Sequence, residues 1–221
     1  MTCKLISMLT WHDVTVPDAK EVFLGAKDAP CDQWGFKIEG TTPKSFAELA
    51  ATMRDAGKET FIEVLAMSEE DCIQAARQCV AGGVDHMLGT PYWPSVQEIL
   101  GEAGISYSPF PALDQDSHMR RPVIDVVADI KAKEEAGVDG ITLSAFRYLG
   151  EEGPEALLEA VNAGVEKPFR IAGSVNSFER IDYLKTLDKL AGFTIGGAFF
   201  ENKFGSTFAE NVTTVCERLE Q

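Results

Sequence analysis

Short apolar runs alternate with longer segments in which apolar and polar residues mix. The apolar runs are rich in β-branched and aromatic residues, and most of them lead into glycine or proline, as buried strands commonly do. We therefore expect eight strands, at residues 4–10, 35–40, 60–66, 86–90, 106–111, 141–146, 169–173 and 193–197.

Between these runs, apolar residues recur at the three- and four-residue spacing of an amphipathic helix. The segment 43–56 shows the pattern at Phe46, Leu49 and Met53, and Ser68 stands where the next helix needs an N-cap. We expect helices at residues 17–27, 43–56, 69–82, 94–103, 123–136, 154–165, 177–191 and 208–219.

Strict alternation of strands and helices indicates parallel strands, which either a doubly wound sheet or a closed barrel satisfies. The number of strands and their even spacing favour the barrel, and no change of composition marks a linker. We therefore predict an α/β protein with a (β/α)8 TIM-barrel fold, formed by one domain over residues 1–221.

The composition narrows the functional classes. A chain of 221 residues that is 45% hydrophobic suits one domain with a large core. The net charge of −15 argues against non-specific binding of nucleic acid or of an anionic membrane. Five cysteines, an odd number without a C-x-x-C pair, indicate reduced thiols. The start Met1–Leu5 enters a strand at once and resembles no signal peptide, so we expect a cytoplasmic protein.

The last quarter of the chain has a feature of its own. The expected strands in 168–175 and 192–200 both run into small residues, first Gly173-Ser174 and then Gly196-Gly197. Backbone without bulky side chains at a strand end can bring its N–H groups close to an anion. In (β/α)8 enzymes a phosphate site commonly lies after strands 7 and 8. The alternative is that these glycines only permit tight turns.

The two segments Ile171–Val175 and Thr194–Phe199 resemble the closing half of the ribulose-phosphate-binding barrels, and the resemblance is clearest over residues 168–200. That superfamily contains sugar-phosphate decarboxylases, epimerases and aldolases, and its members often dimerise, although no stretch of this chain marks an interface. The resemblance implies a lyase or isomerase of carbohydrate metabolism, which acts on a small phosphorylated sugar or keto acid through an enediolate or enolate. It also implies that the substrate phosphate lies on the backbone of Gly173, Ser174, Gly196 and Gly197.

Charged residues inside two apolar strands are the first candidates for catalysis. Lys37 and Glu39 share a face of one expected strand, and Glu63 is enclosed by apolar neighbours in the next. We expect these three side chains to meet inside the barrel, either as catalytic groups or as a structural network. The resemblance adds that Glu39 and Glu63 hold Mg²⁺, with Lys37 as proton donor to an enediolate. However, Val64–Ser68 replace the Lys and Asp that follow the strand-3 acid in the family's decarboxylases.

Further candidates follow other expected strands, on the face where barrel enzymes carry their active sites. His12 follows the first strand and is a candidate general base. Arg120 and Arg121, in a long loop after the fifth strand, and Arg147, after the sixth, are candidate contacts for an anionic substrate. For each of them the alternative is an ordinary solvated loop residue.

Two other functions stay open. Lys37 is the one lysine well inside an expected strand, and it can act as the nucleophile of a Schiff-base aldolase if it loses its proton. The family's aldolases take this lysine from the sixth strand, where 141–146 has none. The other function is a barrel that binds a phosphorylated ligand without catalysing a reaction.

Overall fold

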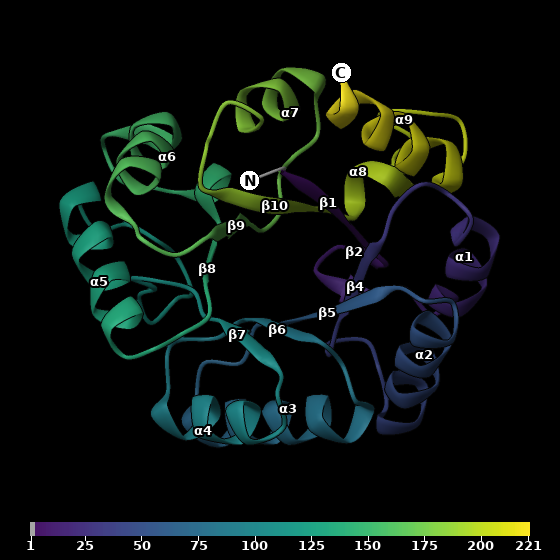
Figure 1. Cartoon of the computed structure of the whole chain (residues 1–221), viewed down its shortest axis with the longest axis horizontal. Helices are drawn as coiled ribbons and strands as arrows, with labels where there is room; N and C mark the ends of the chain where they lie inside the picture. Colours follow the sequence, from purple (N-terminus) through teal and green to yellow (C-terminus); the bar gives the residue numbers. More distant parts are fainter. Residues whose placement is uncertain (1–2) are drawn as a thin grey trace.

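Eight parallel strands form one sheet that curls into a barrel (Figure 1), in the order β7-β6-β5-β4-β1-β10-β9-β8. The computed structural model describes residues 3–221, so Met1 and Thr2, which begin the expected domain, lie outside the described part. The barrel strands are β1 (Lys4–Met8), β4 (Gln33–Lys37), β5 (Glu59–Val64), β6 (His86–Gly89), β7 (Ser106–Ser108), β8 (Ile141–Leu143), β9 (Phe169–Ile171) and β10 (Leu190–Ile195). Each overlaps the range expected from the sequence.

The two end strands of the order, β7 and β8, are linked at isolated points. The Asp139 N–H donates to the Tyr107 carbonyl, and the Thr142 N–H donates to the Pro109 carbonyl, both at 3.1 Å. The Thr142 hydroxyl adds a bond to the Ser108 carbonyl at 2.8 Å. These bonds nearly close the ring, so the predicted (β/α)8 TIM barrel is confirmed and the doubly wound sheet is excluded.

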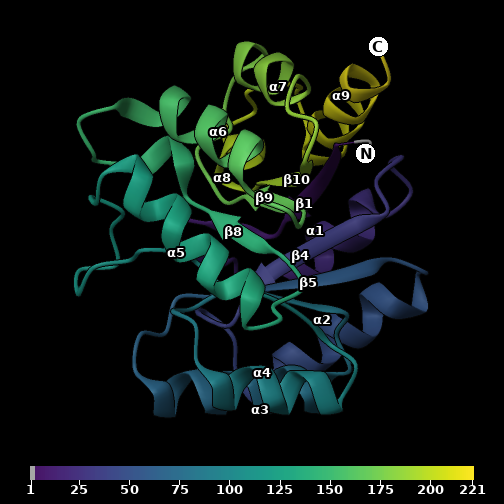
Figure 2. The same cartoon turned by 60° about the vertical axis from the view of Figure 1, so that its left-hand side comes forward.

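The helices lie around the outside of the barrel (Figure 2). Local signals fix several ends: the Ser68 hydroxyl accepts from the Asp71 N–H as expected of an N-cap, and Gly83 ends the same helix with φ +61°. The helices are α1 (Ala19–Ala26), α2 (Pro43–Asp55), α3 (Glu69–Gly82), α4 (Pro94–Glu102), α5 (Val123–Glu135), α6 (Gly153–Gly164), α7 (Phe178–Leu184), α8 (Gly197–Phe200) and α9 (Phe208–Glu220), with a 3₁₀ turn η1 (Ala145–Arg147).

Three local expectations were wrong. The first strand ends at Met8, and the chain then forms a small antiparallel hairpin of β2 (Thr10–Trp11) and β3 (Val14–Thr15). Helix α7 ends at Leu184 rather than at residue 191, and the Thr186 hydroxyl bonds the Tyr183 carbonyl where the chain turns off. The short helix α8 directly after β10 was not expected.

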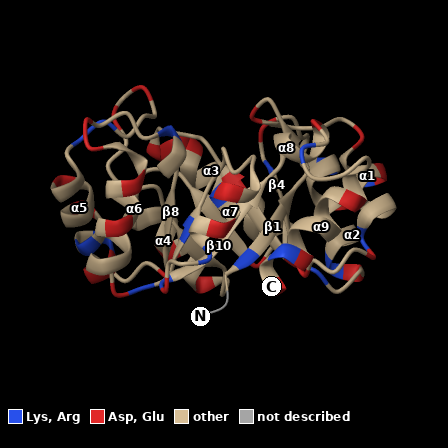
Figure 3. Cartoon of the chain, turned by 90° about the horizontal axis from the view of Figure 1, so that it is seen from above, with Lys and Arg blue, Asp and Glu red and all other residues tan. Residues whose placement is uncertain are grey.

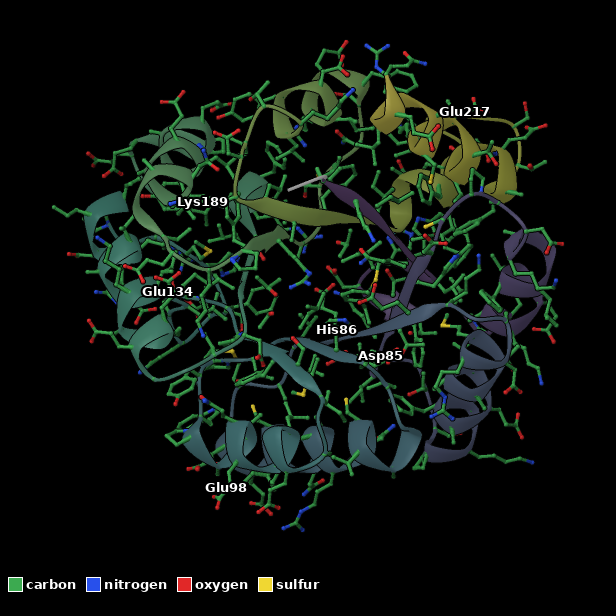
Figure 4. The ribbon with its side chains drawn as sticks, viewed as in Figure 1. Asp85, His86, Glu98, Glu134, Lys189 and Glu217 are labelled. Atoms are coloured by element: carbon green, nitrogen blue, oxygen red, sulfur yellow. The ribbon has the colours of Figure 1, made fainter. Side chains whose placement is uncertain are left out.

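The inside of the barrel is apolar in the middle and polar at both ends. Ile6, Met8, Phe61 and Leu88 form the apolar middle cluster. At the amino ends of the strands, His86 lies near the barrel axis in Figure 4, while Glu98 and Glu217 lie at the periphery. The Nε2 atom of His86 is 2.6 Å from a Glu59 oxygen, and the His86 ring stacks on the Phe61 ring with 4.2 Å between the centroids. His86 therefore belongs to the packing at the amino-terminal end of the barrel.

Charge is distributed unevenly. Acidic residues cover the outer helices and the loops at the barrel end that carries α8 (Figure 3), in keeping with the net charge of −15. Because the protein is so acidic, positive charge that can contact an anionic ligand must be local.

Within residues 3–221, each helix is too short or too polar to cross a membrane.

Candidate active site

A cavity of about 560 Å³ opens at the carboxyl ends of the barrel strands. Its lining comes from the segments that follow seven of the strands, including Asp13 after β1, Thr90 after β6 and Gly173 after β9, and from Lys37 at the end of β4 itself. Active sites of (β/α)8 enzymes lie at this end of the barrel, because loops of many strands converge there. The cavity is therefore the candidate active site.

A nearly buried ion pair forms the floor of this cavity. Lys37, the last residue of β4, is directly beside Glu63 of β5 in the sheet register, so both side chains point into the barrel. The Lys37 Nζ is 3.2 Å from Glu63 Oε1, and the side chains are 5% and 9% exposed. The expected meeting of Lys37 and Glu63 is confirmed.

Asp13 brings a second carboxylate to Lys37, with 2.9 Å between Oδ1 and Nζ. Asp13 and His12 form the tip of the β2–β3 hairpin, with φ values of +62° and +51°. The hairpin is held against β4 because the Thr15 hydroxyl donates to the Lys37 carbonyl (2.7 Å) and accepts from the Lys37 N–H (2.9 Å). One side-chain hydroxyl thus positions the hairpin that carries Asp13.

The two carboxylates set the protonation state of Lys37. Burial by itself lowers the pKa of Lys37, but the neighbouring charges of Glu63 and Asp13 outweigh it, and the pKa lies above its ordinary value. Burial likewise raises the pKa of Asp13, while the hydrogen bond from Lys37 and the charge of Arg147 bring it below its ordinary value. At neutral pH the floor therefore holds an ammonium group beside an ionised Asp13.

The four residues expected to bind phosphate all line the same cavity. They follow β9 and β10, which are neighbours in the sheet. Gly173 and Ser174 have positive φ values of +77° and +60°, and the Gly173 N–H donates to the Thr194 hydroxyl at 3.0 Å. Gly197 begins α8, and the first N–H groups of a helix have no acceptor within it. A Cβ at Gly196 would lie 2.5 Å from the carbonyl oxygen of Thr10 in β2.

Arg147 links this glycine edge to the cavity floor. It is the last residue of η1, which follows β8. Its Nε donates to the Ser174 hydroxyl at 3.2 Å, and its terminal nitrogens lie 3.4 Å from the Asp13 carboxylate. Its side chain is half exposed, so a ligand anion can reach the guanidinium.

The remaining candidates differ in whether they line the cavity. His12 lines the cavity and stacks on Trp11, with 4.6 Å between the rings. Arg120 lies outside the lining and pairs with Asp114 and, at 3.5 Å, with Asp116 of its own loop. Arg121 is also outside the lining. Of the three arginines proposed from the sequence, Arg147 alone lines the cavity.

Glu39 does not join Lys37 and Glu63, because β4 ends at Lys37 and the strand pattern stops there. Its Oε1 accepts the Leu65 N–H at 3.1 Å, and it is absent from the cavity lining. Residues 3–221 contain no cluster of three or more His, Cys, Asp or Glu with the geometry of a metal site, and Glu63 is already paired with an ammonium group. These donors do not fit a protein-held Mg²⁺, so magnesium stays a prediction and we derive no step through it.

Asp13 is a site residue that the sequence does not single out. Its only signal there is its place next to His12, after an expected strand. Nothing in the sequence 9–16 has the Asn-Gly or Gly-Gly pattern that marks a tight hairpin.

No protein-family model matches the sequence, and no curated protein matches it. The fold, in contrast, matches many solved structures. Orotidine 5'-phosphate decarboxylase from Pyrococcus horikoshii OT3 has a TM-score of 0.70 at 12% identity, over 98% of this chain and 99% of that one. A structure described as native KDPGal has a TM-score of 0.69 at 16% identity, over 100% and 96%. N-acetylmannosamine-6-phosphate 2-epimerase from Clostridium perfringens has 0.65 at 10% identity, over 88% and 86%.

The chain shares the (β/α)8 barrel fold of these proteins. The likeness expected from residues 168–200 is thus confirmed at the level of fold. A decarboxylase and an epimerase of phosphorylated compounds are among the structures that share it. At such low identities the comparison shows the fold but not the reaction, which must be argued from the geometry of the site.

Proposed function

We propose that this barrel is an enzyme, a lyase or isomerase, that binds a small phosphorylated carbonyl compound and stabilises its enediolate or enolate. One observation carries the proposal: the nearly buried Lys37 ammonium is held between Asp13 and Glu63 on the floor of the cavity that the glycine edge also lines. A fixed, nearly buried cation is suited to an oxygen on which negative charge develops.

The phosphate is assigned to the glycine edge. Gly173, Ser174, Gly196 and Gly197 offer backbone that a phosphate can approach closely, and Arg147 supplies a guanidinium beside Ser174. In a chain with a net charge of −15, this local cation is the feature that favours an anion there. Anchoring the phosphate places the carbonyl group of a short ligand over Lys37.

The proposed chemistry is a proton transfer at the carbon next to the carbonyl. Asp13 accepts the proton, the C–H electron pair moves into the new carbon–carbon double bond, and Lys37 donates a hydrogen bond to the enediolate oxygen. Return of the proton to a different position gives an isomerase. In a lyase the enolate arises instead when the bond between the α and β carbons breaks: Asp13 accepts the proton of a β-hydroxyl group, whose carbon becomes a carbonyl, and the electron pair of the broken bond forms the enolate that Lys37 stabilises. Glu63 acts as a positioning residue that holds Lys37, and His12 is a candidate proton carrier at the rim.

The charge state of Lys37 bears on the alternative Schiff-base reaction. A nucleophilic lysine must first be a neutral amine, whereas Glu63 and Asp13 favour the ammonium form and raise the pKa of Lys37. The geometry therefore favours Lys37 as a hydrogen-bond donor over Lys37 as a nucleophile. Borohydride treatment in the presence of a carbonyl ligand separates the two roles, because only a Schiff base is trapped covalently.

A thermal-unfolding screen tests the proposal. Keto and aldo compounds are compared as phosphorylated and unphosphorylated pairs with the wild-type protein and with Arg147→Met. A ligand at about one hundred times its Kd stabilises by about 2.7 kcal/mol, which raises the Tm of a domain of this size by roughly 5–10 °C. We expect such shifts with the phosphorylated partner alone and smaller ones with Arg147→Met. Equal shifts within each pair would overturn the phosphate assignment.

A further inference from the structure

The cavity wall formed by the segments after β5 and β7 is largely apolar. The ring order of the strands places β5 opposite β9 and β6 opposite β10, which Figure 1 shows as facing sides of the barrel. Apart from the exposed loop tip of residues 116–118, the segments after β5 and β7 line this wall with apolar side chains: Leu65, Met67, Phe110, Leu113 and Met119. Leu65 and Met67 thus lie across the cavity from the glycine edge, and the residues after β7 lie across from β1, with Lys37 and Glu63 in the cavity floor.

This wall has the construction of a binding surface. Phe110 and Met119 are fully buried and give it a fixed base. The Phe110 ring fits there because Gly89 has no side chain, since a Cβ would lie 2.7 Å from the ring. Leu65 lines the same cavity and is 37% exposed. An exposed leucine in a concave site gains from contact with an apolar ligand group.

Two polar groups on this side of the cavity already have partners. The buried Thr90 hydroxyl shares a hydrogen bond with the Tyr107 hydroxyl at 2.7 Å and is 2.9 Å from the Pro91 carbonyl oxygen. The Leu65 N–H is taken by Glu39. Asp116, Ser117 and His118 belong to the exposed tip of the loop at the rim. A hydroxyl group of a sugar placed against Phe110 would therefore lose its hydrogen bonds to water without replacement.

We infer that the substrate carries an aliphatic or aromatic group at the end remote from its phosphate, rather than the hydroxyl groups of a sugar chain. The phosphate lies at the glycine edge, the carbonyl lies over Lys37, and the apolar group packs against Leu65, Phe110 and Met119. This inference rests on the proposed function and adds to it the class of substrate: a phosphorylated carbonyl compound with an apolar substituent.

A series of simple phosphate esters tests the inference without knowledge of the reaction. Calorimetric titration of the wild-type protein compares methyl, ethyl, butyl and hexyl phosphate with glycerol phosphate. Each methylene group that enters the apolar wall tightens binding about fourfold. Butyl phosphate therefore binds at least tenfold more tightly than glycerol phosphate, and methyl phosphate binds most weakly of the alkyl esters.

Two matched variants locate the effect. Leu65→Ser weakens the binding of hexyl phosphate about tenfold and leaves methyl phosphate unchanged. Leu24→Ser, at a leucine on the outer helix α1 that is 46% exposed and outside the cavity, changes neither. Both leucines are exposed, so both variants keep the fold, which the thermal-unfolding midpoint verifies.

The outcomes separate this inference from the proposed function. Phosphate esters that all bind with the same affinity, or glycerol phosphate that binds as tightly as butyl phosphate, would overturn the apolar substituent and leave the phosphate site standing. Alkyl phosphates that bind no better than the matching alcohols would overturn the phosphate site itself, and the proposed function with it.

Discussion

The ion pair on the cavity floor makes a sharp prediction for protein stability. Lys37→Met removes the ammonium group that lies 3.2 Å from Glu63 and 2.9 Å from Asp13. The Asp13 side chain is half exposed and regains water, whereas Glu63 is 9% exposed and is left as a nearly buried, unpaired carboxylate. The loss of stability therefore comes mainly from Glu63.

The structure gives the magnitude. At 3.2 Å and an effective dielectric constant of about 20, the attraction between the two charges is about 5 kcal/mol. Breaking a buried pair by removal of one partner typically costs about 3–5 kcal/mol. We expect Lys37→Met to lower the free energy of unfolding at pH 7 by about 3 kcal/mol or more. Glu63→Gln removes the unpaired charge, so adding it to Lys37→Met restores about 2 kcal/mol.

The assay is urea unfolding of the wild type, both single variants and the double variant, followed by circular dichroism and by tryptophan fluorescence. Agreement of the two probes supports two-state analysis, and an unchanged m-value shows that the denatured state is comparable. The reasoning is refuted if Lys37→Met costs less than about 1 kcal/mol, or if the double variant is less stable than Lys37→Met.

Other residues allow further tests. Arg147→Met should weaken binding of a phosphorylated ligand about tenfold by calorimetry, and the effect should be larger at low salt. The control Arg218→Met, on an outer helix, should leave binding unchanged. Equal losses in the two variants would show that Arg147 does not bind the phosphate. Gly196→Ala should cost about 1–3 kcal/mol in urea unfolding because its Cβ meets a carbonyl oxygen of β2 at 2.5 Å, whereas Gly101→Ala in α4, with open space around it, should be neutral or stabilising; the reverse order would contradict the packing of the hairpin on α8. Burial lowers the pKa of His86, so the folded state favours the neutral ring, and stability should fall as the pH drops below about 6.5, the ordinary value of an unfolded histidine. His86→Gln should reduce this slope between pH 7.5 and 5, and an unchanged slope would show that His86 is not its source.

The barrel could be predicted because its signals are local. Short apolar runs mark the strands, and amphipathic segments between them mark the helices. The number and order of elements therefore follow from residues that are neighbours in sequence. The pairing of Lys37 with Glu63 could be predicted for the same reason: each is a charged residue within a buried strand, and both needed a partner.

The rest of the site depends on where the chain leaves the strands. Glu39 was placed beside Lys37 on the assumption that the strand continues to Gly40, but β4 ends at Lys37. Asp13 reaches Lys37 because two non-glycine residues, His12 and Asp13, adopt positive φ at the hairpin tip. Thr15, outside the turn, holds the hairpin against β4. Contacts of this kind, between segments that are not neighbours in sequence, carry no local signal.

Exchange of a carbon-bound proton with solvent tests the central claim most directly, namely that Lys37 stabilises an enolate of a phosphorylated carbonyl ligand. The ligand with the largest phosphate-dependent thermal shift is incubated in D₂O with Glu63→Gln or with Glu63→Gln/Lys37→Met, and NMR follows deuterium at the carbon next to its carbonyl. Both variants lack the Glu63 charge, so they differ in Lys37 without leaving an unpaired buried carboxylate. We predict that both bind the ligand and that loss of Lys37 slows deuterium uptake at least about a hundredfold. Equal uptake with and without Lys37, or no uptake even with the wild-type protein, would contradict the proposed role of Lys37.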